Sequence, residues 1–269
     1  MSVFTSVGRT VVDYSRDGRE NLSFLGESVV CSLGTLTHPR QFRVRDFLLS
    51  FQRASYGGLP ITVCIGFLLG VILAFQTAAV LKSFGVETFV ANMLAIALFR
   101  ELGPIITAVI LAGRTGSAFA AEIGTMKVNE ELDALTTMGL PPVRFLVLPR
   151  VAAAILSMPV LTIFAELAGL FGGAIVLQAM GVPTVVFWRG VSTSTTAFMI
   201  CEGLTKGALF GMLVGLIGCL AGMRTAASSD GVGRSTTSAV VWSIVAIAVT
   251  DGLLAVITYI WGIGMSVTI

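Results

Sequence analysis

Six charged residues interrupt the long apolar stretches of this sequence and are its first candidates for chemistry: Arg100, Glu101, Glu166, Glu202, Lys206 and Asp251. A charge at the centre of a membrane-spanning helix costs roughly 2.5–3.5 kcal/mol on insertion scales, so such residues are expected to face a partner charge or a water-filled cavity. They could bind a charged group inside a cavity, or they could be structural ion pairs that hold helices together. The residues alone leave both interpretations open.

The spacing of these charges suggests how some of them pair. Glu202 and Lys206 are four residues apart, which allows an ion pair along one helix. Arg100 and Glu101 are adjacent, so their side chains point in different directions. One of the two can therefore pair while the other faces a cavity.

The chain is not expected to be an enzyme. It has no G-x-x-x-x-G-K-[ST] loop, so it is not itself a P-loop ATPase. The G-x-S-x-G and H-E-x-x-H patterns are also absent, and the sequence has one histidine. We expect no catalytic centre, no cofactor and no metal site.

The composition indicates the environment of the chain. Of 269 residues, 55% are hydrophobic and 12% are charged, with a mean hydropathy of +0.92. Soluble domains carry about 25% charged residues, so these values argue against a soluble enzyme, a disordered chain and a nucleic-acid binder. A membrane-spanning helix needs about 20 mostly apolar residues. Five stretches predict an all-α membrane protein: Leu59–Val80, Phe89–Ala112, Val151–Met180, Ala197–Met223 and Ser238–Gly262.

Basic residues indicate the orientation of the five spans. Seven arginines precede the first span, four bases lie between residues 114 and 150, and two lie between the fourth and fifth spans. The opposite side carries only Lys82 and Arg189. The positive-inside rule then predicts a cytoplasmic N-terminus and a periplasmic C-terminus. At a rise of 1.5 Å per residue, the charges inside the spans lie in the middle or outer half of a core about 30 Å thick.

The chain divides into an N-terminal segment, residues 1–58, and a single five-helix membrane domain, residues 59–269. Apolar residues at steps of three and four in the first segment predict a helix with one apolar face: Leu22, Leu25, Val29, Leu33 and Leu36. Such an amphipathic helix lies in the inner membrane interface, with arginines on anionic headgroups, or it packs on its own protein in the cytoplasm.

A short helix near 130–138 is predicted in the cytoplasmic stretch between the second and third spans. Asn129 is a suitable N-cap, and Glu130 and Glu131 in the first turn favour the helix dipole. Gly139 and the prolines after it are a stop signal. The helix carries an apolar stripe of Leu132, Leu135 and Met138. This stripe packs against the protein's own spans, or it docks into a groove on a cytoplasmic subunit.

Glycines recur every four residues inside three of the spans. The fourth span holds Gly203, Gly207, Gly211 and Gly215, and the same spacing separates Gly66 from Gly70 and Gly169 from Gly173. Small residues at this period let helices approach each other closely. The glycines indicate tight packing within the subunit or a seam that forms a dimer.

Three runs of the sequence are similar to motifs of a known family. They read LFRELGPIITA from residue 98, AGRTGSA from residue 112 and GVGRSTTSAVV from residue 231. In these runs the chain resembles the MlaE-type (YrbE-type) permeases, which are membrane subunits of ABC transporters that move lipids through MCE-protein assemblies. The resemblance extends over nearly the whole chain from about residue 40 and includes the number of spans.

The resemblance implies a function and partners. The chain would be the permease of an ATP-driven transporter that moves phospholipid, or a related lipid, between the inner membrane and an MCE-protein conduit. This transport would support outer-membrane lipid homeostasis. The permease would be a homodimer, with a cytoplasmic ABC ATPase beneath it and a periplasmic MCE-domain protein on its outer face. It would lie in a cell inner membrane or a plastid inner envelope, and the helix near 130–138 would be the coupling helix that receives force from the ATPase.

The resemblance also bears on the intramembrane charges. Arg100 and Glu101 match a charged pair in the family's second span, near the lipid pocket. Lys206 and Asp251 correspond more weakly to polar residues that face the interior. The two remaining glutamates are candidates from this sequence alone.

The buried acids also suit a protein of another class, an ion- or proton-coupled secondary transporter. That class commonly contains an inverted repeat, and no such repeat is visible in this sequence. A purely structural membrane scaffold is a third possibility, which the number of intramembrane charges makes less attractive.

Overall fold

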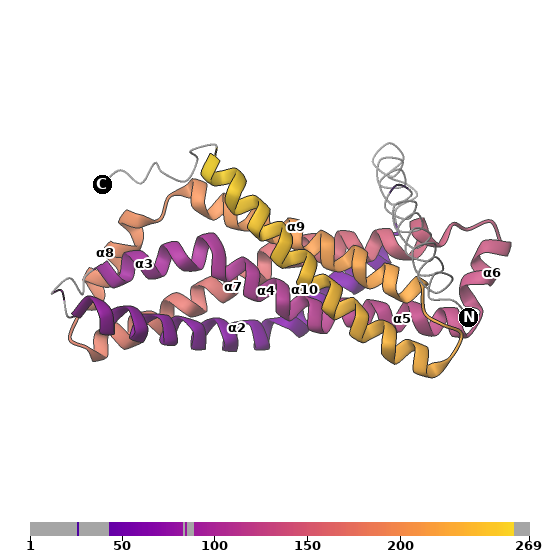
Figure 1. Ribbon diagram of the computed structural model, residues 1–269, viewed down its shortest axis with the longest axis horizontal. Helices are drawn as coiled ribbons and strands as arrows, with labels where there is room; N and C mark the ends of the chain where they lie inside the picture. The colour runs from indigo at the N-terminus through magenta and orange to yellow at the C-terminus, as the bar shows by residue number, and fades with distance from the viewer. Residues whose placement is uncertain (1–25, 27–42, 83, 85–88, 261–269) are drawn as a thin grey trace, which may run out of the picture.

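The computed structural model describes residues 26, 43–82, 84 and 89–260, and the helices of residues 43–82 and 89–260 form an elongated bundle (Figure 1). Five helical stretches are long and apolar enough to cross a membrane, so the number of predicted spans is confirmed. Their bounds are Val44–Leu81, Val90–Val128, Val143–Ala179, Ala197–Met223 and Ser229–Ile260. The N-terminal helix predicted from its apolar face lies outside the described residues.

The first span, α2 (Val44–Lys82), is 39 residues long and begins well before the predicted start at Leu59. The apolar run Leu59–Val80 covers only the part of the helix whose side chains suit a lipid environment. Backbone hydrogen bonds between residues four apart continue the helix past that run, through the arginine-rich turns that precede it. The boundary that we placed between residues 58 and 59 therefore falls inside one continuous helix.

The second span is a single helical rod with two π-helical turns. Its parts are α3 (Val90–Ala97), η3 (Leu98–Leu102), α4 (Gly103–Leu111), η4 (Ala112–Gly116) and α5 (Ser117–Val128). Pro104 has no N–H for the carbonyl four residues earlier, and next to it Gly103 donates to the carbonyl of Leu98, five residues back. The predicted end of this helix near Ala112 is wrong, because the helix continues to Val128 through residues that we had placed between spans.

The remaining elements complete the bundle. They are η5 (Val143–Val147), α7 (Leu148–Ala179), α8 (Thr184–Ser194), α9 (Ala197–Met223) and α10 (Ser229–Ile260). α7 packs against both α2 and α9 and is the most buried of the five spans. α10 crosses α9 and α5 on the outside of the bundle (Figure 1) and is the least buried span.

The regularly spaced glycines pack helices together within the subunit. A Cβ atom added to Gly70 of α2 would lie 1.9 Å from the carbonyl oxygen of Gly169 of α7. A Cβ atom on Gly203 of α9 would lie 2.1 Å from the carbonyl oxygen of Phe99. Backbone meets backbone at both places, which only a residue without a side chain permits. The interpretation as internal packing is confirmed for these glycines.

The short helix between the second and third spans is α6 (Glu131–Thr137), close to its predicted bounds. Asn129 is not its N-cap, because α5 runs to Val128 and Asn129 ends that helix instead. Glu130 precedes α6 in the left-handed conformation, with φ of 61°, and reverses the chain. Gly139 follows α6 with φ of +74°, which confirms the predicted stop.

Candidate functional site

Five of the six intramembrane charges form one connected network that joins η3, α9 and α10. Lys206 of α9 lies at its centre, with Nζ 2.7 Å from Glu101 Oε2 and 3.4 Å from Asp251 Oδ1. The Lys206 side chain is only 4% exposed, so both carboxylates compensate a cation that is removed from water. The network therefore ties together three elements that are far apart in the sequence.

Arg100 forms the looser end of this network. Its Nε lies 3.9 Å from both Glu101 Oε1 and Glu202 Oε1, which is too long for a hydrogen bond. Glu202 Oε1 is buried and has no hydrogen-bond partner in the part of the chain that the structure describes. The Arg100 side chain is 25% exposed. Arg100 therefore keeps guanidinium donors that can bind an added acceptor, whereas the Lys206 ammonium group already binds two carboxylates.

The predicted ion pair between Glu202 and Lys206 along α9 is not formed. Lys206 pairs with acids on η3 and α10, and Glu202 lies nearest to Arg100. The two residues share a face of α9, but the partners brought in by neighbouring helices lie closer. Spacing within one helix could not reveal those partners.

The π-helical turn explains why the network forms at this level. Pro104 offers no N–H to the carbonyl of Arg100, four residues earlier. Lys206 Nζ lies 3.4 Å from that carbonyl oxygen and donates to it. π-Helical turns are frequent at functional sites. This one exposes a backbone acceptor next to two charged side chains.

Glu166 does not join the network. It lies on α7 and is 2% exposed. Its Oε1 would be 2.9 Å from a Cβ atom added to Gly103, so the glycine leaves room for the carboxyl group. Within residues 43–82 and 89–260, no cation lies within ion-pair distance of Glu166, and its predicted place among the cavity residues stays a prediction.

The apolar stripe of the short helix is divided between two environments. Leu132 is 8% exposed and belongs to the main buried cluster of the bundle, and Leu135 packs against that cluster. Met138 is 65% exposed. Glu130 and Glu131 are exposed as well. α6 lies at one end of the bundle, with α8 at the opposite end (Figure 1).

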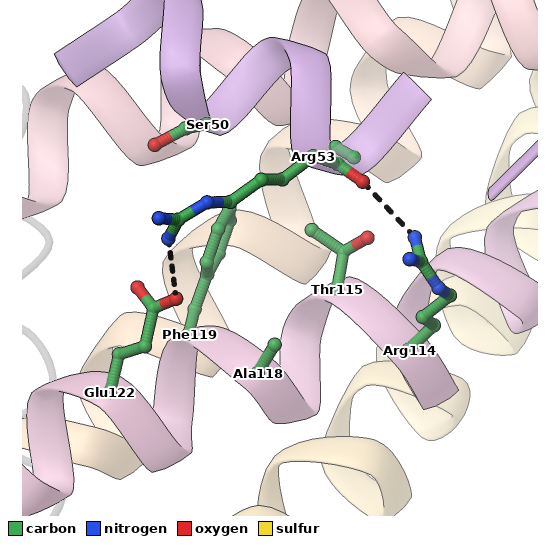
Figure 2. A pocket seen from close by; sticks show the side chains of 8 residues that line it. Ser50, Arg53, Arg114, Thr115, Ala118, Phe119 and Glu122 are labelled. Atoms are coloured by element: carbon green, nitrogen blue, oxygen red, sulfur yellow. Dashed lines mark hydrogen bonds and ion pairs between the residues drawn. The ribbon is translucent and has the colours of Figure 1, made fainter. Parts of the chain in front are cut away.

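A second cluster of charges joins α2, α5 and α7, and none of its members was among the predicted site residues. Glu122 of α5 accepts from Arg53 of α2 at 3.2 Å and from Arg150 of α7 at 3.0 Å. Arg53 and Glu122 line a cavity at the arginine-rich end of the bundle (Figure 2), and all three residues line a second cavity beside it. The available signal was that Glu122 is the one acid between residues 114 and 150 that lies outside the helix predicted near 130–138, which makes it the natural partner for arginines of other spans.

Comparisons with known proteins agree with this architecture. Residues 47–257 match the family described as Permease MlaE. The chain is 33% identical to the intermembrane phospholipid transport system permease protein MlaE of Haemophilus influenzae, over 96% of this chain and 98% of that protein. It is 34% identical to a probable ABC transporter permease protein of a Synechocystis species, over 89% of this chain and 94% of that protein. The chloroplast protein TRIGALACTOSYLDIACYLGLYCEROL 1 of Arabidopsis thaliana is 34% identical over 78% of this chain and 61% of its own length.

Proposed function

This chain belongs to the MlaE permease family of ABC transporters, and we propose that it moves phospholipid out of or into the membrane that it spans, driven by a partner ATPase. The name of the Haemophilus relative supports phospholipid as the substrate. The partners are a cytoplasmic ABC ATPase, a second copy of the chain and a periplasmic MCE-domain protein. The N-terminus is cytoplasmic, and the membrane is a bacterial inner membrane or, in a plastid, the inner envelope.

The observation that carries this proposal is the charge network inside the apolar bundle. A lipid substrate needs apolar walls for its acyl chains and a polar group for its headgroup phosphate. Arg100 is the better candidate for the phosphate, because Lys206 is buried and holds two carboxylates. Lys206 then positions the π-helical turn that carries Arg100. Closure of the ATPases pushes on α6 and narrows the cavity around the network.

Purification of the native complex in mild detergent tests the proposal as a whole. We expect an ATPase chain and bound phospholipid to accompany the permease. A preparation in which this chain transports lipid analogues between vesicles without ATP would contradict the proposal and favour a secondary transporter.

Arg100→Ala is expected to slow ATP-dependent lipid transfer between vesicles by at least about tenfold, equivalent to about 1.4 kcal/mol. The reason is the loss of the cation that we assign to the headgroup phosphate. The ATPase should still co-purify, because α6 is untouched. Arg234→Ala is the matched control, since Arg234 is 83% exposed and, among the described residues, pairs only with Asp230 of the same helix. Equal transfer by both variants would refute the role of Arg100.

Met138→Asp and Glu131→Lys are expected to release the ATPase, each lowering its co-purification by at least about tenfold, or about 1.4 kcal/mol of binding. Both side chains are exposed on α6 and therefore available to a partner. Their substitution should leave the thermal stability of the permease unchanged. Leu132→Asp should lower the stability of the permease as well, because Leu132 is buried in the bundle. Full ATPase recovery with both exposed-face variants would exclude α6 as the coupling helix.

A further inference from the structure

A cavity of about 230 Å³, with Arg53, Arg114 and Glu122 in its lining, lies between α2 and the η4–α5 segment, away from the central network. A second cavity of about 280 Å³ shares Ser50, Arg53 and Glu122 with it and extends toward η5 and α7. Figure 2 shows Arg53 reaching from α2 to Glu122 on α5, while Arg114 points back to the carbonyl of Arg53. None of the five networked charges lines either cavity, so this is a separate site.

The arginines around the two cavities outnumber the acids. Four arginines face two carboxylates, which leaves an excess of two positive charges: Arg43, Arg53, Arg114 and Arg150 against Asp46 and Glu122. Glu122 is already shared between two guanidinium groups. The cavities therefore suit an added anion.

Several guanidinium donors of these arginines have no acceptor within residues 43–82 and 89–260. Arg150 Nε is buried and has no hydrogen-bond partner in that part of the chain. The Arg53 side chain is 72% exposed and gives one N–H to Glu122. Arg114 is exposed too, and it gives Nη1 to the carbonyl of Arg53 at 3.1 Å. Arginine presents several donors in a planar fork that matches phosphate oxygens.

The helix that opposes Arg114 makes room for its guanidinium group. A Cβ atom on Gly57 of α2 would lie 1.9 Å from Arg114 Nη2. Any other residue at position 57 would displace that guanidinium from its place beside the cavity. The basic character of this cavity is thus built by both helices.

The cavity lies at the level of lipid headgroups. Residues 54–81 carry no charge, and Lys82 lies 29 residues after Arg53, or about 44 Å at 1.5 Å per residue. A bilayer with its headgroup regions is about 40–45 Å thick. The backbone positions 53 and 82 of α2 therefore lie at the levels of opposite headgroup regions. Tyr56, one turn beyond Arg53, is 80% exposed, as is common for aromatic residues at a membrane interface.

We propose that these two adjoining cavities form one site that binds the phosphate of an anionic phospholipid headgroup in the leaflet next to the arginine-rich end, which is the cytoplasmic leaflet in the orientation proposed above. Arg53, which lines both cavities, holds the phosphate together with Arg114 of the first and Arg150 of the second, and Glu122 keeps Arg53 and Arg150 in place. Apolar side chains such as Ala54 and Phe119 border the first cavity and meet the first carbons of the acyl chains. The bound lipid fills the gap between α2 and α5.

A local fluorescence reporter tests this site apart from the central one. Leu49 lines the second cavity and is 43% exposed, so Leu49→Trp places a reporter there when Trp188, Trp242 and Trp261 are replaced by phenylalanine. Phosphatidylglycerol with brominated acyl chains, titrated into the native complex in phosphatidylcholine nanodiscs, should quench it at low mole fraction. Brominated diacylglycerol, which lacks phosphate, should quench it only in proportion to its abundance. Ile72→Trp, on the same helix and 51% exposed, reports the bulk lipid in both titrations.

Substitutions then identify the residues responsible. The double substitution Arg53→Gln with Arg114→Gln should raise the mole fraction of brominated phosphatidylglycerol needed to quench the reporter at position 49 by at least about tenfold. The reason is that charge-assisted contacts to phosphate are lost. Arg45→Gln is the matched control, since Arg45 is exposed on the same helix and lines neither cavity. Equal quenching by the two brominated lipids, or no effect of the double substitution, would overturn the proposal.

Two further results would also overturn it. Inorganic phosphate that displaces the lipid at millimolar concentration would show a soluble-anion site. A reporter shielded from every brominated lipid would show that another protein surface fills the cavity. The quenching requires neither ATP nor transport, so its failure is distinguishable from failure of the proposed transport function.

Discussion

Lys206→Met is expected to destabilise the permease by about 3–5 kcal/mol, the usual cost of removing one partner from a buried ion pair, and to abolish lipid transfer. Lys206 is 4% exposed and compensates both Glu101 and Asp251. Its loss leaves two carboxylates in a medium of low polarity without their cation. Thermal unfolding in detergent measures the first effect, and ATP-dependent lipid transfer between vesicles measures the second.

A second substitution separates stability from function. Adding Glu101→Gln to Lys206→Met removes one of the stranded charges and should recover part of the stability. It should not recover transfer, because the contacts that position Arg100 remain broken. Lys206→Arg keeps the positive charge. Its unfolding temperature and its rate of lipid transfer should therefore lie between those of the two other variants and those of the unchanged protein. An unfolding temperature unaffected by Lys206→Met would show that the network does not hold the three helices together.

Gly70→Val is expected to lower stability by about 3 kcal/mol or more, at the upper end of the usual cost of overpacking. A Cβ atom at position 70 would lie 1.9 Å from the carbonyl oxygen of Gly169. That neighbour is backbone and cannot rotate away, so α2 and α7 must separate. The measurement is the unfolding temperature in detergent, together with the yield of folded protein.

Two other glycines supply the comparison for Gly70. No atom of the described residues lies within 4 Å of a Cβ atom added to Gly233 in α10, so Gly233→Ala should be neutral or gain up to about 1 kcal/mol of helix propensity. Gly173 in α7 would meet Leu94 Cδ2 at 2.1 Å, a flexible side chain that can turn. Gly173→Ala should therefore cost less than any substitution of Gly70. Similar losses at all three positions would mean that the close backbone contact is not the cause.

Much of the membrane architecture was predictable from hydrophobicity. The apolar runs identified all five spans, and the motif around Arg100 and Glu101 placed these two charges in the second span. The predicted bounds of the spans were less accurate. Side chains stop being apolar where a helix leaves the lipid, but its backbone hydrogen bonds continue beyond that point. Helix α2 therefore begins at Val44, and the second span extends to Val128.

The pairing of charges was predictable only in part. The energetic cost of burying a charge required that Lys206 and the buried acids find an ion-pair partner or a cavity. It did not identify the partner of each residue. The pair along α9 was wrong, and Glu166 stands apart from the network although it is as deeply placed in its span. The same limit hid Glu122, whose two arginine partners come from α2 and α7.

The sequence alone determined what depends on neighbours along the chain. It determined the number of apolar spans, the charges that must be compensated inside them, the stop at Gly139 and the glycine spacing that permits close contact. Only the tertiary structure decided which charges meet, which face of α6 is buried, and that Arg53, Arg114 and Arg150 gather around two adjoining cavities. The physical reason is that ion pairs and cavities depend on how neighbouring helices cross and how far each is displaced along its axis. Those quantities arise from packing between residues a hundred positions apart, which the period of a single helix does not contain.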